Sequence, residues 1–265
     1  MRELLSRRFK HMNRLYHFTN YEAACSIIRS KQLRFGKRSN MNDLIESRKI
    51  TTRRVFFADI GDDMSKEYFP EKEMMRYQQI SFAQDRNVED TLLEGFNLHS
   101  MWGLYAERGY GVCLVFDKDK LKLGKTDYAR DVVYKDWIMP DYDFKSSRKS
   151  EIRAEIWKRR DDFFFLKRKE WEREQEYRII RRAKNETDDE YLDVSESLAF
   201  AIISREESLR YDEPIWSGKY YRHIKYISNR KLPVLWYTPS MDGYCLYHDW
   251  MEPVWTEEGG FESWD

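Results

Sequence analysis

Residues 109–117 read GYGVCLVFD, in which a continuous apolar run, Val112–Phe116, lies between two glycines and an aspartate. A short apolar run bounded by turn residues is typical of a strand buried on both faces. We therefore predict a buried strand here and place the other elements around it.

Short strands and helices alternate on either side of this strand. A helix is predicted over 99–106, because Met101, Trp102 and Tyr105 recur at helical spacing. Asn20 is a good N-cap for an earlier helix that should end near residues 30–31. Aromatic and β-branched runs predict short strands at 15–19, 33–35, 79–83 and 130–134.

The later part of the chain is more highly charged. Residues 145–173 carry an apolar stripe among many charges, which predicts one long helical region. Further strands are expected at 176–180, 225–227 and 234–237. Short strands interleaved with helices, without regular βαβ spacing, favour the α+β class.

No Gly/Ser-rich linker divides the chain, and Gly (11) and Pro (6) are scarce. We therefore expect one domain over 1–265. Residues 14–182 would be its core and carry the motifs, and residues 183–265 would complete the sheet.

The 265-residue chain has 47 Lys+Arg, 47 Asp+Glu and 16% aromatic residues. The aromatic content argues against disorder, and the zero net charge does not suggest a general nucleic-acid binder, although it leaves room for a local basic groove. The N-terminus lacks the apolar core of a signal peptide, no apolar run approaches the ~20 residues that cross a membrane, and three scattered cysteines suggest no disulfide framework. We expect a cytoplasmic protein without membrane contact.

Common catalytic motifs are missing from the sequence. It has no GxxxxGK[ST], HExxH, GxSxG or paired CxxC, and the Gly-Tyr-Gly at 109–111 lacks the third glycine of a dinucleotide-binding fingerprint. The five histidines show no i,i+4 pair, so no metal site is predicted. Three other segments carry candidate functional side chains.

The first segment is His17-Phe18-Thr19, at the end of the first strand. Strand alternation places His17 and Thr19 on one face, where an imidazole and a hydroxyl can hydrogen-bond a ribose and an amide. The alternative is that both side chains are simply paired within the fold.

The second segment is the helix that carries His99, Trp102 and Tyr105 at i, i+3 and i+6. Side chains at this spacing share a face and can stack a flat heterocycle such as nicotinamide or a base. The alternative is an ordinary core stripe.

The third segment contains Glu174, Glu176 and Arg178, which alternate along a strand. One carboxylate can hydrogen-bond a sugar hydroxyl and stabilise an oxocarbenium ion. The alternative is a solvated charged face in which Arg178 pairs with Glu176. Geometry also leaves open a glycosidase that uses both carboxylates, whereas the Asp/Glu/His clusters of a metal-dependent nuclease are not visible.

A basic and aromatic region offers a nucleic-acid surface. Residues 158–160 and 167–169 are all Lys or Arg, and they alternate with Trp157, Phe163–Phe165 and Trp171. Such surfaces suit single-stranded nucleic acid. A charged helix face above a packed underside explains the pattern equally well.

The order of these blocks resembles an uncharacterised bacterial family of domains of unknown function. The shared blocks are LYHFT, SIIRSKQLRF, SFAQD, MWGLYAERGYGVCLVFD and WEREQEYRII, over about residues 14–182. Family members open on an LYHYT-like strand, carry a WxxYAxxHxG-like block and close on an ExEYR-like strand. Here Arg108 and Gly109 stand in place of the usual His-x-Gly turn.

More distantly, the arrangement is similar to the ADP-ribosyltransferase superfamily. This resemblance implies a split antiparallel β-core with flanking helices, a first-strand His, a central aromatic residue and a late-strand Glu. Residues 17–19 match the His-Gly-Ser/Thr of poly-ADP-ribose polymerases except at the middle position, and Glu174 with Glu176 matches the ExE form.

The resemblance also implies roles for individual residues, with NAD as substrate and no metal. His17 would hold the ribose, the Phe18 backbone would meet the nicotinamide amide, and Thr19 would orient the sugar. Tyr105 or Trp102 would stack on the nicotinamide ring. Glu176, with Glu174 as the alternative, would stabilise the transition state. Arg34 or Arg178 would hold the pyrophosphate.

These expectations describe an NAD-dependent ADP-ribosyltransferase, a toxin or phage-defence effector that modifies nucleic acid or protein. Its expected partners are NAD, an RNA or DNA acceptor, and an antitoxin or chaperone protein. The alternative is a non-catalytic module of the same fold that binds a nucleotide or a partner protein.

Overall fold

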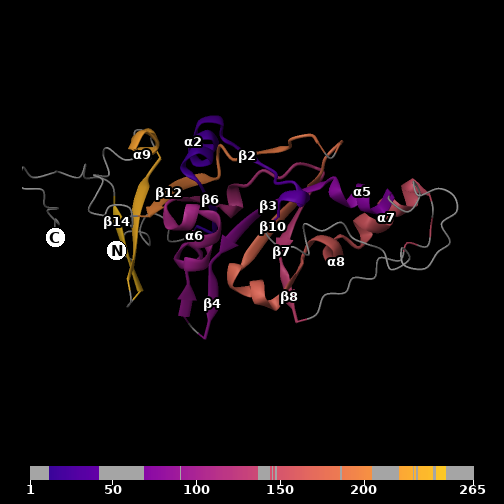
Figure 1. Ribbon diagram of the computed structural model, residues 1–265, viewed down its shortest axis with the longest axis horizontal. Coiled ribbons are helices and arrows are strands. Elements are labelled where there is room, and N and C mark those ends of the chain that lie inside the picture. Colours follow the sequence, from indigo (N-terminus) through magenta and orange to yellow (C-terminus); the bar gives the residue numbers. More distant parts are fainter. Residues whose placement is uncertain are drawn as a thin grey trace, which may run out of the picture. The chain divides into compact units, whose positions relative to one another are not determined.

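The computed structural model describes residues 12–41, 69–89, 91–136, 144, 146, 148–185, 187–204, 221–228, 230, 232–240 and 243–248. These residues group into two compact units, each built from separate stretches of the chain (Figure 1). The first unit draws on residues up to 31, from 87 to 121 and from 195 onward. The second draws on residues 32–86 and 122–194.

The strands of the first unit lie in the order β14-β13-β12-β6-β1. They are β1 (Arg14–Thr19), β6 (Val112–Asp117), β12 (Leu198–Ser204), β13 (Val234–Ser240) and β14 (Gly243–His248). β6 is buried along its whole length and lies antiparallel between β1 and β12, which confirms the buried strand predicted from GYGVCLVFD. β12 and β13 run parallel, so the sheet is mixed.

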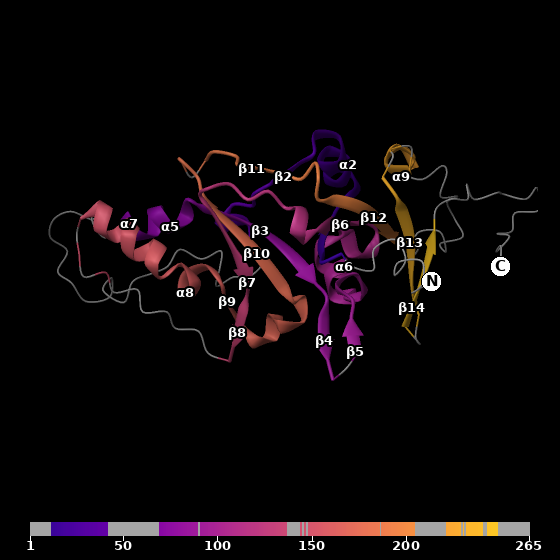
Figure 2. The ribbon, with the colours of Figure 1, turned by 180° about the vertical axis from the view of Figure 1, so that it is seen from behind.

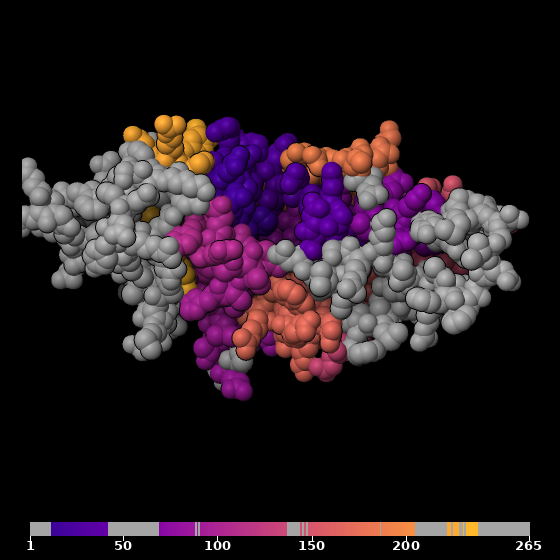
Figure 3. Space-filling model, in the orientation of Figure 1, coloured from indigo at the N-terminus to yellow at the C-terminus, as the bar shows by residue number. Residues whose placement is uncertain are grey.

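The helical segments of this unit are α2 (Tyr21–Ser30), η3 (Gly95–Asn97), α6 (His99–Tyr105), η4 (Glu107–Gly109), η5 (Lys118–Lys120) and α9 (Tyr221–Ser228). α2 begins and ends as predicted: the Asn20 side chain accepts a 2.7 Å hydrogen bond from the Ala23 N–H, and Lys31 closes the helix in the left-handed region. In Figure 3 the atoms of α2 (indigo) and of the α6 region (magenta) are visible on the same face of the unit.

The predicted strand at 225–227 is wrong, because these residues belong to α9. A three-residue apolar run cannot distinguish a strand from a helix, and packing against α2 decides the outcome. The ring of His223 stacks on Tyr21, and Arg29 lies 5.2 Å from the centroid of the Tyr226 ring.

The second unit contains a three-stranded antiparallel arrangement in the order β3-β10-β7, whose strands lie side by side in Figure 2. The strands are β3 (Tyr77–Gln84), β10 (Glu176–Arg182) and β7 (Asp127–Asp131). Two further pairs are β2 (Gln32–Arg34) with β11 (Tyr191–Asp193), which is antiparallel, and β8 (Val133–Lys135) with β9 (Leu166–Arg168), which is parallel. β3 is followed in the chain by β4 (Arg86–Val88), which pairs with β5 (Thr91–Leu93), and apart from Arg86 this pair belongs to the first unit.

The helical segments of the second unit are η1 (Arg38–Asn40), α5 (Phe69–Met75), α7 (Lys149–Lys158), α8 (Arg160–Phe164) and η6 (Lys169–Glu174). They cover a core of Met74, Tyr77, Val132, Ile152, Ile156, Phe163, Phe164, Phe165 and Ile180.

The single long helix predicted over 145–173 is wrong. From residue 149 the chain forms α7, α8, β9 and η6 in succession. Three consecutive phenylalanines, 163–165, are all buried, which a continuous helix with one apolar face cannot achieve. The chain therefore leaves the helix at Phe165 and enters β9, which pairs with β8.

Helices combined with a mixed sheet confirm the α+β class predicted from the sequence. The ADP-ribosyltransferase-like arrangement and the single domain stay predictions.

Candidate functional site

The end of β1 presents His17 and Thr19 on one face. Both are half-buried, and they lie opposite Leu114 and Val112 of β6. Phe18 points the other way and is buried, with its ring edge-on to Trp102 at 5.2 Å. The alternation predicted for these three residues is therefore present.

A strained turn lies against this strand end. Glu107 and Arg108 both adopt positive φ angles, of 48° and 61°, which cost a non-glycine residue about 1–2 kcal/mol each. Gly111 brings the turn onto β1, since a Cβ at this position would lie 2.4 Å from the carbonyl oxygen of Thr19. Strain of this kind is often found at functional sites.

Trp102 is enclosed in the core of the first unit and is 4% exposed. Its ring stacks on Tyr237 at 5.1 Å with a 5° interplanar angle, and its indole N–H donates a 2.7 Å hydrogen bond to the Phe96 carbonyl. These contacts match the core-stripe alternative. Tyr105, from the same helix, is half-buried.

In the second unit, Glu176 and Arg178 form a buried ion pair from neighbouring positions on one face of β10. Arg178 Nε and Nη2 donate to Glu176 Oε1 and Oε2 at 2.6 and 2.9 Å, and Arg178 Nη1 donates to the Phe164 carbonyl at 2.5 Å. Glu176 is 3% exposed and Arg178 is 0% exposed. The pairing is the one expected in the charged-face alternative, but it is buried rather than solvated.

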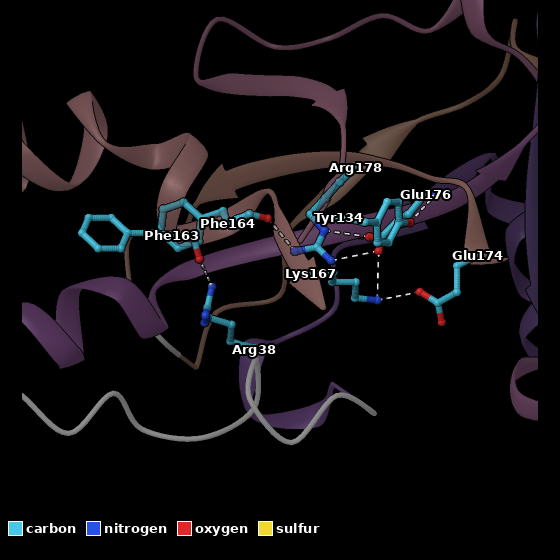
Figure 4. A network of polar contacts seen from close by, with 8 residues as sticks. All are labelled: Arg38, Tyr134, Phe163, Phe164, Lys167, Glu174, Glu176 and Arg178. Atoms are coloured by element: carbon cyan, nitrogen blue, oxygen red, sulfur yellow. Dashed lines mark hydrogen bonds and ion pairs between the residues drawn. The ribbon is translucent and has the colours of Figure 1, made fainter. Parts of the chain in front are cut away.

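Lys167 of β9 joins this pair and links it to Glu174. The Lys167 ammonium lies 2.6 Å from Glu174 Oε2 and 3.0 Å from Glu176 Oε2. We call Lys167, Glu174, Glu176 and Arg178 the ion network (Figure 4). Two cations and two carboxylates alternate in it, so its formal charges balance.

Polar groups surround the ion network. The Tyr134 hydroxyl of β8 accepts a 2.9 Å hydrogen bond from the Glu176 N–H. Gln175 turns the chain between η6 and β10 with φ of 49°, and its buried Oε1 has no hydrogen-bond partner among the described residues. Figure 4 also shows Arg38, which donates a 3.2 Å hydrogen bond to the Phe163 carbonyl. A buried unpaired acceptor marks a place where a ligand donor or a water is expected.

The electrostatics keep Glu176 ionised. Burial alone would raise the pKa of this carboxyl group, but the charges of Arg178 and Lys167, with hydrogen bonds from Arg178 and Ser81, lower the pKa to about 2. Burial raises the pKa of the Tyr134 hydroxyl, which therefore stays protonated near neutral pH. An ionised carboxylate can accept hydroxyl or amide hydrogens and can stabilise a nearby positive charge.

The sequence-predicted residues fall into two sets. His17, Phe18, Thr19, Trp102 and Tyr105 belong to the first unit, in which Phe18 and Trp102 are in contact. The second unit brings Glu174, Glu176 and Arg178 together, while Arg34 is exposed on β2 and its side chain has no hydrogen bond or ion pair within the described part of the chain. The roles assigned to these residues stay predictions.

The sequence does not identify one member of the ion network, Lys167, nor three residues next to the network in space or in the chain: Ser81, Tyr134 and Gln175. Lys167 was considered only as part of a basic run, and Tyr134 only as a strand residue. Since β8 and β9 pair in parallel with Tyr134 opposite Lys167, the two residues meet through a long-range contact that local patterns do not encode. The position of Gln175 between Glu174 and Glu176 is the one local signal in the sequence that points to any of these residues.

Within the described residues, no group of three or more His, Cys, Asp and Glu side chains is placed to hold a metal ion. No helix of that part of the chain has the length and apolar character needed to cross a membrane.

No curated protein and no solved structure matches this chain. One protein family does, and the match runs from α6 to β10, so that it includes the buried strand β6 and the whole ion network. It bears out, over this range, the resemblance to a family of unknown function. Residues 101–179 match the family model described as Protein of unknown function (DUF2971).

Proposed function

We propose that the protein is an NAD-dependent ADP-ribosyltransferase, a toxin or phage-defence effector whose acceptor is a nucleic acid or a protein. In this proposal the fold is a split antiparallel β-core with flanking helices. The first-strand residue is His17, and the late-strand carboxylate is Glu176. An antitoxin or chaperone protein is a further proposed partner.

One observation supports this proposal most strongly: a late-strand carboxylate stays ionised although it is buried. When nicotinamide leaves NAD, the bond between C1′ of the ribose and the ring nitrogen breaks, and the electron pair departs with nicotinamide. The sugar becomes oxocarbenium-like, and the anionic Glu176 is suited to stabilise it. The acceptor then bonds to C1′ and loses its proton.

The exposure of the candidate residues refines their proposed roles. Tyr105 is half-buried, whereas Trp102 is already stacked on Tyr237, so we assign nicotinamide stacking to Tyr105. Arg34 is exposed, whereas the Arg178 guanidinium is buried and donates to Glu176, so we assign the pyrophosphate to Arg34. Arg178 then acts as a positioning residue for Glu176.

A second candidate function is a non-catalytic module that binds a nucleotide or a partner protein. The observation in its favour is that both oxygens of Glu176 are already engaged, by Arg178 and by Lys167. A carboxylate that is 3% exposed stabilises the fold, and NAD would have to displace Arg178 or Lys167 to reach it.

Nicotinamide release from NAD distinguishes the two functions. The wild type is compared with Glu176→Gln, Glu174→Gln and Tyr105→Phe, with RNA, DNA and protein extract added in turn. The transferase predicts release that falls on the order of 10²- to 10³-fold in Glu176→Gln. Tyr105→Phe keeps the ring and should retain most of the activity.

Glu73→Gln is the matched control, because Glu73 is also a buried carboxylate held by arginines in the same unit. It should lose stability but keep its activity per folded molecule. His17→Ala changes a half-buried residue and should abolish release without unfolding the protein. No release with any acceptor, together with no NAD-dependent thermal shift, contradicts the transferase and favours the binding module.

A further inference from the structure

Three arginines converge on one carboxylate at the junction of α5, α7 and β10. Glu73 of α5 forms ion pairs with Arg76 at 3.4 Å, with Arg153 of α7 at 3.3 Å and with Arg182 at the end of β10. Glu73 is 1% exposed. One negative charge therefore faces three positive charges, which leaves an excess of two.

The excess charge reaches the surface. The Arg153 side chain is 46% exposed and the Arg182 side chain 31%, so both are partly open to solvent. Guanidinium groups of this kind bind phosphate oxygens in pairs. The acidic residues of α7 do not cancel the excess, since Glu151 pairs with Arg148 and Glu155 pairs with Arg159.

A second cation, Lys149, precedes Arg153 by four residues on α7, which lies beside α5 in both Figure 1 and Figure 2. Lys149, Arg153 and Trp157 are four residues apart, about 6 Å of helix rise for each step. Lys149 and Arg153 both lie over the Phe69 ring, at 5.3 and 5.5 Å from its centroid. Trp157 is 39% exposed, an unusual degree for this side chain.

Most of the basic residues selected from the sequence have partners outside the group around Glu73. Lys167 is buried in the ion network, Lys169 lies 3.8 Å from Asp136, and Arg168 lies 3.9 Å from Glu170. Arg160 lies 3.9 Å from the centroid of the Tyr128 ring and 4.9 Å from that of the Trp157 ring. The cations around Glu73 therefore form a positive surface of the second unit that the sequence did not suggest.

We propose that Arg76, Lys149, Arg153, Trp157 and Arg182, which we call the arginine face, bind a single-stranded nucleic acid. The cations come from about one turn of α7, from the end of α5 and from the end of β10, which is more than one phosphate group spans. An exposed aromatic side chain beside such cations is typical of surfaces that bind single strands. If the proposed transferase activity holds, this inference names single-stranded nucleic acid as its acceptor.

Binding is measured by fluorescence anisotropy with a labelled single strand of about 16 nucleotides, in RNA and DNA forms, without NAD. The test variant is Lys149→Gln/Arg153→Gln. It keeps Arg76 and Arg182 on Glu73, so the carboxylate does not become an unpaired buried charge. The control is Lys158→Gln/Lys169→Gln, which removes the same charge from the same unit outside the arginine face.

The wild type should bind with a salt dependence that the test variant reduces by about 1.4 in the slope of log K against log salt, because about 0.7 is lost for each single-strand phosphate contact. The control should keep the wild-type slope. Trp157→Ala should weaken binding on the order of tenfold, and both doubles should melt within a few degrees of the wild type.

Several results would overturn the inference. These are no binding of either strand by the wild type, equal losses in the test and control doubles, equal affinity for a duplex of the same length, and equal displacement by polyglutamate. The binding assay contains no NAD, so it is independent of the nicotinamide-release assay. A wild type that binds the strand but releases no nicotinamide contradicts only the transferase. A wild type that releases nicotinamide but does not bind the strand contradicts only the arginine face.

Discussion

A Cβ on Gly111 would lie 2.4 Å from the carbonyl oxygen of Thr19, a separation that real side chains do not reach. Gly111 joins the strained turn to the end of β1, and the Ala106 backbone is also within 2.8 Å of that Cβ. The backbone must shift to accommodate even a methyl group.

We therefore expect Gly111→Ala to destabilise the protein by about 1–3 kcal/mol, measured as a loss in the urea midpoint. Gly103→Ala is the control, because a Cβ on this exposed residue of α6 meets nothing within 4 Å. It should stabilise the helix by about 0.5–1 kcal/mol. Equal effects of the two substitutions would contradict the close approach.

Arg178→Gln should destabilise the protein by about 3–5 kcal/mol, because it removes the guanidinium that neutralises the buried Glu176. Combining it with Glu176→Gln should recover part of this loss, and the coupling in a double-mutant cycle measures the pair. Arg130→Gln is the control on neighbouring β7. Its partner Asp161 is 44% exposed, so the cost should stay below about 1 kcal/mol.

The stability of the protein should fall with pH in the acid range because of Glu176. Its folded pKa is lowered from 4.5 to about 2, so its contribution is complete above the unfolded pKa and is lost as the pH falls from about 4.5 to about 2. The expected contribution is on the order of 3 kcal/mol. Urea unfolding at several pH values should show a shallower acid slope for Glu176→Gln than for wild type, and identical slopes would contradict this assignment.

Arg108→Gly should stabilise the protein by about 1 kcal/mol. Arg108 has φ of 61° and ψ of 37°, a left-handed conformation that glycine adopts without strain. The same substitution at Lys158, the last residue of α7, should destabilise instead. Thermal melting of both variants checks the sign. If the strained turn also serves function, Arg108→Gly should lose activity while it gains stability.

Local signals predicted the elements that depend on local physics. Asn20 supplies the helix cap, Val112–Phe116 form a buried strand, and Met101, Trp102 and Tyr105 lie on one helix. In each case a short stretch contains the turn residues and the periodicity that select its structure.

Tertiary packing decided the elements that were wrong. The chain leaves the helix at Phe165 because the rings of residues 163–165 all enter the core of the second unit, and residues 225–227 become helical against α2. Similarly, strand alternation predicts that Glu176 pairs with Arg178. The contacts that Lys167 and Tyr134 make with Glu176 depend on the parallel pairing of β8 with β9. Sequence patterns do not encode which distant strands meet.

The position of β6 has a consequence for how the chain is made. Its two neighbours, β1 and β12, stand at opposite ends of the sequence, and both pairings are long-range. A nascent chain that ends before β12 leaves one edge of a largely apolar strand uncovered, and uncovered edges template aggregation. Translation must therefore pass Ser204 before this strand is protected, and a fragment cut to residues 101–179 would carry β6 without either neighbour, making it a poor unit for expression by itself.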